Sequence, residues 1–216
     1  MGITQMNKSS RRLFIKTGLW GSTLAMFSHT SSASEPTPKE IKGPFYPLNA
    51  QKDRDFDLTQ VAGKSGVAKG KVVFVEGRVL DSHDKPIENA TVDIWQANAA
   101  GKYNHPHDTY DAPIDPNFQG WAIVQSGENG KFRFKTIIPG IYPATETWDR
   151  PPHIHFKVTK KGYVELVTQM YFPDHKLNTP DLLLAKKSKK QQAQMIATKI
   201  KGKQHSLRYN IVLKKA

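Results

Sequence analysis

The chain has 216 residues, no cysteine and a formal net charge of +13 at pH 7. This length suits one domain, and the lack of cysteine excludes disulfides and thiolate metal sites, so any metal must be held by His, Tyr, Asp or Glu. A basic chain often binds nucleic acid. Because the lysine-rich stretch 186–203 has no aromatic stacking platform, we predict no nucleic-acid partner. The stretch is interpreted either as a solvated basic face or as a modest attraction for a carboxylate-bearing substrate.

The N-terminus has the layout of an export signal. Ser10-Arg-Arg-Leu-Phe-Ile-Lys16 precedes an apolar run at 17–28, and Ser31-Ser-Ala33 supplies small residues for a signal peptidase. The run is too short to span a membrane. The paired arginines resemble a twin-arginine signal, although an ordinary secretory signal has a similar basic start. We predict a twin-arginine-type signal peptide at 1–33, a periplasmic location, and a single functional domain at 34–216 with no membrane span after signal removal.

The remainder of the chain reads as β-structure. Residues 34–42 are predicted to form an extended arm and residues 53–70 a loop. One short helix is predicted at 188–200, where apolar residues share one face. Period-two alternation and intervening turn residues predict seven strands, at 71–80, 90–97, 121–126, 131–135, 152–159, 164–172 and 207–213. We predict an all-β fold, a β-sandwich of about seven or more strands with long loops around the functional site and a short C-terminal helix.

Four side chains stand out as a candidate metal site. His153 and His155 are two residues apart on a predicted strand, so they project from the same face and can share a metal. Tyr142 follows a Pro-Gly turn just upstream, and Tyr103 ends a segment that begins at Trp95. Two imidazoles and two phenolates suit Fe(III) better than Zn(II), which usually also recruits cysteine or carboxylate.

Several motifs occur together in one order along the chain. They are Gly43-Pro-Phe-Tyr46, Ile94-Trp-Gln-Ala-Asn-Ala-Ala-Gly-Lys-Tyr103, Asp115-Pro-Asn-Phe118, Thr136-Ile-Ile-Pro-Gly-Ile-Tyr142-Pro, Arg150-Pro-Pro-His-Ile-His155-Phe, Leu166-Val-Thr-Gln-Met-Tyr-Phe172 and Tyr209-Asn-Ile-Val-Leu213. In this order they resemble the intradiol ring-cleavage dioxygenases, above all the iron-bearing (beta) chains of protocatechuate 3,4-dioxygenases. The resemblance covers nearly all of residues 34–216 and implies that they form a catalytic β-sandwich domain with a loop-lined pocket.

The resemblance also implies a metal and a reaction. Mononuclear Fe(III) would be bound by Tyr103, Tyr142, His153 and His155. The expected substrate is a small aromatic diol, protocatechuate or a substituted catechol, which O2 cleaves to a muconate-type dicarboxylate.

Three residues receive further roles from the resemblance. Tyr142 would act as a base as well as a metal ligand. Arg150 would lie beside the substrate and stabilise negative charge, since it keeps its proton. Gln169 would lie close to iron and substrate.

Assembly and substrate choice stay open at this point. Residues 143–149, which border the expected pocket, form a shorter segment than in related chains. The arm at 34–42 is too short for the helical dimer domain of catechol 1,2-dioxygenases. We therefore expect a homo-oligomer, or a hetero-oligomer with a second dioxygenase chain.

Other residues in the irregular stretch 101–120 compete for a role. His105-Pro-His107 is a second His-x-His motif, but its proline disfavours a regular central strand. We interpret both histidines as lying outside the metal's ligand set or facing solvent. Three aspartates lack the spacing and the glutamate of a calcium loop: Asp108, Asp111 and Asp115.

Two rival functions are consistent with parts of the sequence. Segments 77–92 and 130–134 also look like parts of transthyretin-like sandwiches, which would make the chain a non-catalytic binding module. Such a module would not need the four candidate ligands together. An Fe(II) extradiol-type or cupin oxygenase would instead hold its metal with two histidines and one carboxylate. Trp95 is expected in the core rather than against a substrate.

Overall fold

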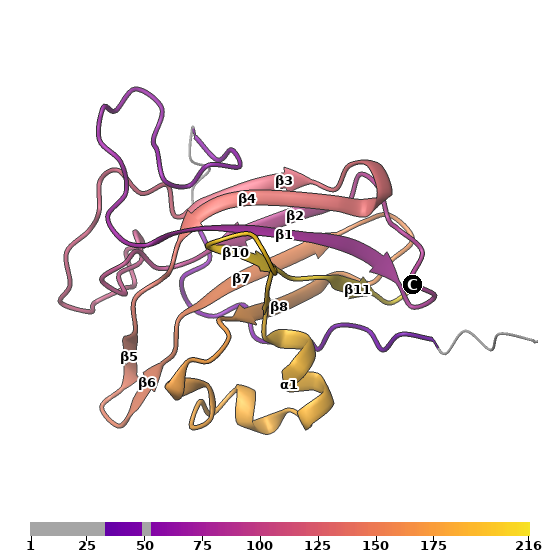
Figure 1. The fold of residues 1–216 in the computed structure, drawn as a ribbon. Helices are drawn as coiled ribbons and strands as arrows, with labels where there is room; N and C mark the ends of the chain where they lie inside the picture. The colour runs from indigo at the N-terminus through magenta and orange to yellow at the C-terminus, as the bar shows by residue number, and fades with distance from the viewer. Residues whose placement is uncertain (1–32, 49–52) are drawn as a thin grey trace, which may run out of the picture. The chain divides into compact units, whose positions relative to one another are not determined.

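Two β-sheets face each other in the structure, a computed structural model that describes residues 33–48 and 53–216 (Figure 1). The strands are β1 (Val72–Asp81), β2 (Thr91–Trp95), β3 (Trp121–Gln125), β4 (Lys131–Ile137), β7 (His153–Thr159), β8 (Leu166–Tyr171), β9 (Thr198–Lys199), β10 (Ser206–Arg208) and β11 (Ile211–Leu213). The first sheet has the order β11-β1-β10-β9, with β4 also paired to β1, and the second has the order β3-β2-β7-β8. The predicted all-β sandwich is confirmed.

The interior between the sheets is apolar because the strands alternate. In β1, Val75 and Val79 are fully buried, whereas Phe74, whose neighbours in the chain point inward, is 40% exposed. Phe134 of β4 meets Phe156 of β7 across the interior, with ring centroids 5.9 Å apart. These residues belong to one cluster that draws on both sheets.

The second sheet is covered on both of its faces. Even-numbered residues of β7, such as Phe156, point into the sandwich, so the odd-numbered His153 and His155 point to the opposite face. A separate aromatic cluster covers that face: Trp95, Ala97, Tyr103, Trp121 and Tyr142, with Phe45 and Tyr46 packed against it. The histidines are therefore buried beneath loops rather than within the sandwich.

A small hairpin stands beside this covered face. It consists of β5 (Tyr142–Thr145) and β6 (Trp148–Arg150), which pair in antiparallel fashion. In Figure 1 the hairpin lies at the end of the sheets away from the C-terminus, on the same side as the long loops. Three single turns of 3-10 helix complete the fold: η1 (Glu128–Gly130), η2 (Lys176–Asn178) and η3 (Leu184–Lys186).

The C-terminal helix is shorter than the predicted range of 188–200. α1 spans Lys189–Met195 and begins with a capping box formed by Ser188 and Gln191. Ile196 already has extended backbone angles and makes a bridge with Tyr171. The apolar residues that suggested a longer helix thus serve partly as strand, because contact with β8 replaces the next helical turn.

The last predicted strand, 207–213, is divided in two. β10 and β11 both run parallel to β1, at successive positions along it. Between them the Asn210 side chain accepts a hydrogen bond from the backbone N–H of Arg78 at 3.0 Å. A side chain therefore takes the place of a backbone partner at the break.

The predicted arm at 34–42 is confirmed as extended chain. The backbone N–H groups of Ser34, Thr37 and Glu40 donate to carbonyls of Ser82, Val212 and Val167, respectively. Residues 1–32, which hold nearly all of the predicted signal peptide, lie outside the described residues. Among the residues that are described, no helix has the length and apolar character needed to cross a membrane.

Candidate active site

The paired histidines of β7 meet at the covered face of the second sheet. His153 and His155 are 2% and 3% exposed, and their Nε2 atoms are 3.2 Å apart. The Nδ1 of His153 lies 2.7 Å from the carbonyl oxygen of Pro151, which can only accept a hydrogen bond. The proton of His153 is therefore on Nδ1, and its Nε2 offers a lone pair toward His155.

His155 is held by an aromatic stack. It lies opposite Trp95 in the pairing of β7 with β2, and the two rings stack at 4.8 Å with an interplanar angle of 11°. Trp95 is 1% exposed, as expected for a core residue. Gly43 is also close to this ring, because a Cβ there would lie 3.2 Å from Cε1 of His155. The imidazole is thus stacked on a tryptophan and adjacent to a position where a side chain would crowd it.

Two glycines allow the loops that carry the tyrosines to meet. A Cβ on Gly101 would lie 2.2 Å from the carbonyl oxygen of Ile141, and one on Gly140 would lie 2.3 Å from the backbone nitrogen of Gly101. Because neither has a Cβ, Tyr103 and Tyr142 approach to 5.6 Å between ring centroids, almost perpendicular at 86°. The Pro-Gly turn seen in the sequence therefore positions both tyrosines.

Asp108 fixes the loop that carries Tyr103. Its carboxylate accepts hydrogen bonds from the backbone N–H of Tyr103 at 2.7 Å and of Tyr110 at 2.9 Å, and it lies 3.4 Å from Nζ of Lys102. Its role is to hold a loop. His105 is 8% exposed, and its ring is 5.8 Å from that of Phe45.

The four candidate ligands converge. The ring of Tyr142 lies 5.7 Å from His153, and that of Tyr103 lies 6.3 Å from His155. The hydroxyl of Tyr103 is buried with no hydrogen-bond partner among the described residues. Such a buried polar atom is costly unless something binds it. The structure therefore brings together all four residues that the sequence singled out.

Burial sets the protonation states of the four rings. It lowers the pKa of His155 to about 3, with a further contribution from the nearby positive charge of Arg150. The pKa of His153 is also well below its ordinary value, for the same reasons. Both imidazoles are therefore neutral near pH 7, as metal ligands must be. Burial raises the pKa of Tyr103 and of Tyr142, so their phenolates need a bound cation to form.

This donor set fits a ferric ion. It offers two neutral nitrogens and two phenol oxygens, and the buried hydroxyl of Tyr103 has no hydrogen-bond partner among the described residues. Within residues 33–48 and 53–216, no three His, Cys, Asp or Glu side chains are grouped closely enough to hold a metal. A metal held by both histidines of the pair would therefore take tyrosine as its further protein ligand.

Arg150 belongs to a buried polar network beside the rings. It lies opposite Tyr142 in the β5–β6 hairpin. Its Nε donates to Asp181 at 2.9 Å, and its Nη2 donates to Gln169 at 2.6 Å and to the hydroxyl of Tyr171 at 3.2 Å. Burial acts to lower the pKa of Arg150, but Tyr142, Tyr171 and Asp181 raise it overall, so the guanidinium stays positive.

Gln169 and Tyr171 come from β8. They lie opposite His155 and His153 in the pairing of β7 with β8. The hydroxyl of Tyr171 also donates to Asp181, which is fully buried and accepts the backbone N–H groups of two following residues. Sequence reasoning assigned neither Asp181 nor Tyr171 to the site. Tyr171 lies within the predicted strand 164–172, but nothing in the pattern linked it to Arg150, and Asp181 comes from an irregular segment.

A cavity of about 520 Å³ opens onto the rings. Two of the four candidate ligands, Tyr142 and His155, line it together with Arg150 and the hairpin residues Thr145 and Glu146. The rest of the lining is Ile41, Gly43, Pro44, Phe45, His107, Asp108, Thr109, Tyr110, Pro143, Ala144 and Trp148. Its size suits a small aromatic ligand.

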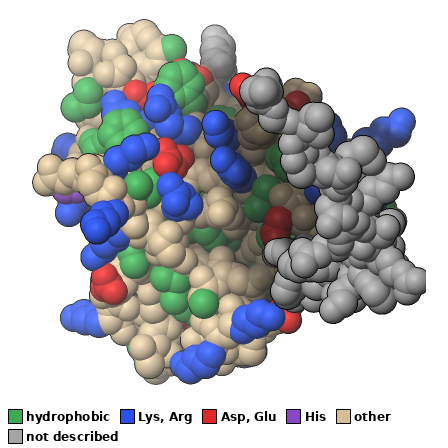
Figure 2. Space-filling view, turned by 45° about the vertical axis from the view of Figure 1, so that its right-hand side comes forward, with side chains coloured by type: hydrophobic (Ala, Val, Ile, Leu, Met, Phe, Trp, Pro, Cys, Tyr) green, Lys and Arg blue, Asp and Glu red, His purple; other side chains and the backbone are tan. Residues whose placement is uncertain are grey.

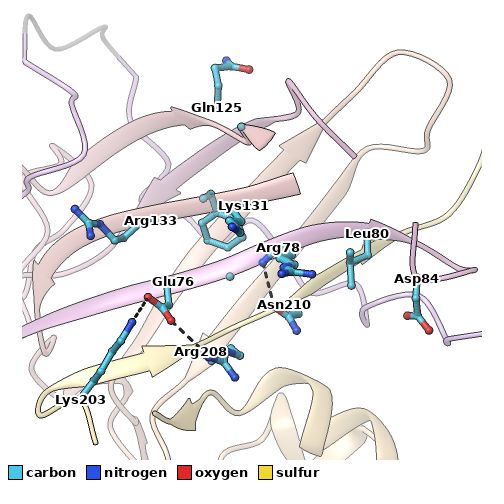
Figure 3. A pocket seen from close by; sticks show the side chains of 13 residues that line it. Glu76, Arg78, Leu80, Asp84, Gln125, Lys131, Arg133, Lys203, Arg208 and Asn210 are labelled. Atoms are coloured by element: carbon cyan, nitrogen blue, oxygen red, sulfur yellow. Dashed lines mark hydrogen bonds and ion pairs between the residues drawn. The ribbon is translucent and has the colours of Figure 1, made fainter. Parts of the chain in front are cut away.

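A larger hollow on the outer face of the first sheet contains none of the predicted site residues (Figure 3). Glu76 there pairs with Lys203 at 3.4 Å and with Arg208 at 3.6 Å, while Arg78 and Lys131 lie opposite each other on β1 and β4. The space-filling view likewise shows many Lys and Arg side chains on one face of the molecule (Figure 2). Basic charge is thus present on outer surfaces, away from the candidate ligands.

Comparison with known proteins agrees with this geometry. A family model described as "Dioxygenase" matches residues 41–215. The chain belongs to the intradiol ring-cleavage dioxygenase family. It is 43% identical over 145 residues to the protocatechuate 3,4-dioxygenase beta chain of Burkholderia cepacia, a match that covers 64% of this chain and 61% of that protein. It is 31% identical over 157 residues to hydroxyquinol 1,2-dioxygenase of a Rhizobium strain, covering 67% of this chain and 49% of that protein. The matches thus span about half to three fifths of these relatives.

Solved structures share the fold. The dioxygenase domain of a dioxygenase carbohydrate-binding protein fusion from Streptomyces sp. SirexAA-E superposes with a TM-score of 0.64 at 26% identity, covering 84% of this chain and all of that chain. The 3-chlorocatechol 1,2-dioxygenase of Rhodococcus opacus 1CP has a TM-score of 0.65 at 23% identity, covering 86% of this chain and 76% of that chain. The intradiol-type sandwich predicted from the sequence is therefore the fold of this chain.

Proposed function

We propose that the protein is an Fe(III)-dependent dioxygenase that cleaves a catechol-type aromatic diol with O2, between the two hydroxyl-bearing carbons, to a muconate-type dicarboxylate. The observation that carries the proposal is the convergence of Tyr103, Tyr142, His153 and His155 on one covered face. Family membership supports it, since this family generally uses non-heme iron. These four residues would hold the metal.

The bound ferric ion would supply the Lewis acidity that lets phenols and catechols ionise near neutral pH. Tyr142 would act as the base, with its phenolate oxygen taking a proton from the catechol. Its position supports this role, because it lines the cavity and is more exposed than Tyr103, at 7% against 3%.

Arg150 would stabilise negative charge on the reacting oxygens. Its Nε and Nη2 are used by Asp181, Gln169 and Tyr171, and among the hydrogen bonds of the described residues none uses Nη1. Since Arg150 lines the cavity, Nη1 is the donor left for a substrate oxygen. A fixed donor in a water-poor site needs no reorganisation as charge develops.

Gln169, which is fully buried and does not line the cavity, would position Arg150 and through it the substrate. Its Oε1 accepts from Nη2 of Arg150, and its Nε2 donates to the carbonyl oxygen of Ile41 at 3.2 Å. It thereby links the guanidinium to the segment that covers the cavity. Trp95 and Phe45 would exclude water from the rings, because Trp95 stacks on His155 and Phe45 lies 4.7 Å from Tyr103.

Location and assembly remain proposals. The arginine pair in residues 1–33 supports export to the periplasm as a twin-arginine substrate. We propose an oligomer, either of identical copies or with a second dioxygenase chain, as the word "beta" in the name of the Burkholderia cepacia relative suggests. The mass in solution of the purified mature protein, expressed alone or together with a candidate second dioxygenase chain, distinguishes these two assemblies.

The rival functions fit the site less well. A transthyretin-like binding module has no use for two buried neutral imidazoles that face two buried phenols. An extradiol-type Fe(II) site needs a carboxylate beside the two histidines, and Asp108, which is close in the loop, is occupied by backbone N–H groups and Lys102.

Product analysis tests the reaction. Iron-loaded protein is given catechol, 4-methylcatechol and protocatechuate in air, and the products are identified by mass. A muconate-type dicarboxylate that carries both atoms of labelled O2 supports the proposal. A 2-hydroxymuconic semialdehyde would instead indicate cleavage outside the diol and contradict it.

A further inference from the structure

The cavity carries little positive charge for its place in a basic protein. Among the residues that line it, Arg150 is the one Lys or Arg side chain, while Asp108 and Glu146 are acidic. The lysines and arginines of Figure 3 belong to a different surface, on β1, β4 and the segment 203–208. The net charge of the chain therefore says little about the charge of its ligand.

The charge of Arg150 is already balanced. Asp181 is fully buried and pairs with its Nε at 2.9 Å, so the two together add no net charge to the cavity. Asp108 is balanced in the same way by Lys102. Glu146 forms no ion pair among the described residues, and it lines the cavity from the hairpin turn. The lining thus carries a net negative charge before a metal is bound.

The two charges lie at different ends of the hairpin. Arg150 pairs with Tyr142 at its base, next to the candidate ligands, whereas Glu146 follows Thr145 at its tip. At about 3.3 Å per residue, the tip is roughly 10 Å or more from the base. A catechol whose oxygens face Tyr142 and Arg150 has its far ring edge away from the one guanidinium of the lining, in a cavity that Glu146 also lines.

We propose, on the basis of the proposed function, that the site selects catechols whose ring substituents are uncharged, and that Glu146 disfavours a ring carboxylate. The substrate class is a neutral alkyl-, halo- or unsubstituted catechol rather than protocatechuate. Side chains along the cavity suit such a ring edge, because Ile41, Phe45 and Trp148 offer apolar contact. The excess lysines then form a solvated surface and do not attract a carboxylate-bearing substrate to the cavity.

A pair of near-isosteric ligands tests the charge alone. The dissociation constants of 3,4-dihydroxybenzamide and 3,4-dihydroxybenzoate are measured without O2. Each ligand is titrated into the iron-loaded mature protein, and the change in visible absorption is followed. We expect the amide to bind roughly threefold to tenfold more tightly, because one exposed charge acts through partly solvated space. This preference shrinks in high salt, which screens such charges.

Two charge-reversal variants complete the test. Glu146→Lys is expected to bring the ratio of the two constants to about one or below. Glu165→Lys makes the same change of net charge at an exposed residue that lines a different hollow, and is expected to leave the ratio unchanged.

Each outcome is decisive. If both ligands shift the absorption but the benzoate binds as tightly as the amide, or Glu165→Lys moves the ratio as much as Glu146→Lys does, the charge inference is overturned. If neither ligand shifts the absorption of iron-loaded protein, the proposed function itself fails.

Discussion

Asp181 offers the sharpest test of the network that holds Arg150. Its side chain is fully buried and pairs with a guanidinium whose own side chain is 5% exposed. Removing one partner of such a pair leaves a charge buried without compensation, which costs about 3–5 kcal/mol. We therefore expect Asp181→Asn to lower the free energy of unfolding by about 3 kcal/mol or more, measured by urea denaturation followed by circular dichroism.

A second ion pair provides the control. Lys199 and Asp174 are only 2.7 Å apart, but their side chains are 70% and 78% exposed. Exposed pairs contribute about 1 kcal/mol or less, so Asp174→Asn should change stability little. Asp174 has a positive φ of 61°, a conformation that asparagine tolerates. The two ion pairs have similar distances, so the difference between the two losses of stability reports the effect of burial on an ion pair.

A double-mutant cycle decides whether the cost belongs to the pair. Arg150→Met alone leaves Asp181 uncompensated, whereas Arg150→Met with Asp181→Asn removes both charges. We expect the double variant to be more stable than the sum of the single effects predicts, by about 2 kcal/mol. Strictly additive losses, or a loss below about 1 kcal/mol for Asp181→Asn, would refute this reasoning.

The same variant tests positioning of Arg150. In folded Asp181→Asn protein the guanidinium loses one of its anchors, so we expect kcat to fall about 10–100-fold, more than KM rises. A purely structural role would change the folded fraction without moving kcat per folded molecule.

Two further predictions concern the ligands. Gly43→Ala should reduce iron retention, because its Cβ would press on His155. Gly63→Ala is the control: its φ is similarly positive, so the backbone strain is comparable, but the space around it is open and iron retention should stay intact. Iron per protein after gel filtration measures both variants, and equal losses of iron would count against the contact between position 43 and His155. Tyr103→Phe and Tyr142→Phe each remove one phenol oxygen, so each should weaken and shift the visible absorption of the iron-loaded protein; a spectrum unchanged in both variants would exclude tyrosine ligation.

Much of the site could be predicted because it depends on local periodicity and covalent order. The two-residue spacing of His153 and His155 puts them on one face of any strand. The Pro-Gly turn before Tyr142 marks a tight reversal whatever its surroundings. These features can be predicted from the sequence because residues close together in the chain determine them.

What escaped prediction depends on contacts between distant segments. Asp181 is far from Arg150 in the chain, and a lone aspartate in an irregular stretch carries no sign that it is buried. Gly101 matters only because Gly140 and Ile141 press against it. The early end of α1 has the same cause, since Ile196 bridges to Tyr171 of β8 instead of continuing the helix.

The visible spectrum of the purified, iron-loaded mature protein tests the central claim most directly. The account predicts a red-brown absorption from tyrosinate-to-Fe(III) charge transfer that shifts when catechol is added without O2, and that is lost when Tyr103 and Tyr142 are both replaced by phenylalanine. A protein that stays colourless after reconstitution with iron in air, or whose colour is unaffected by that double replacement, would contradict it.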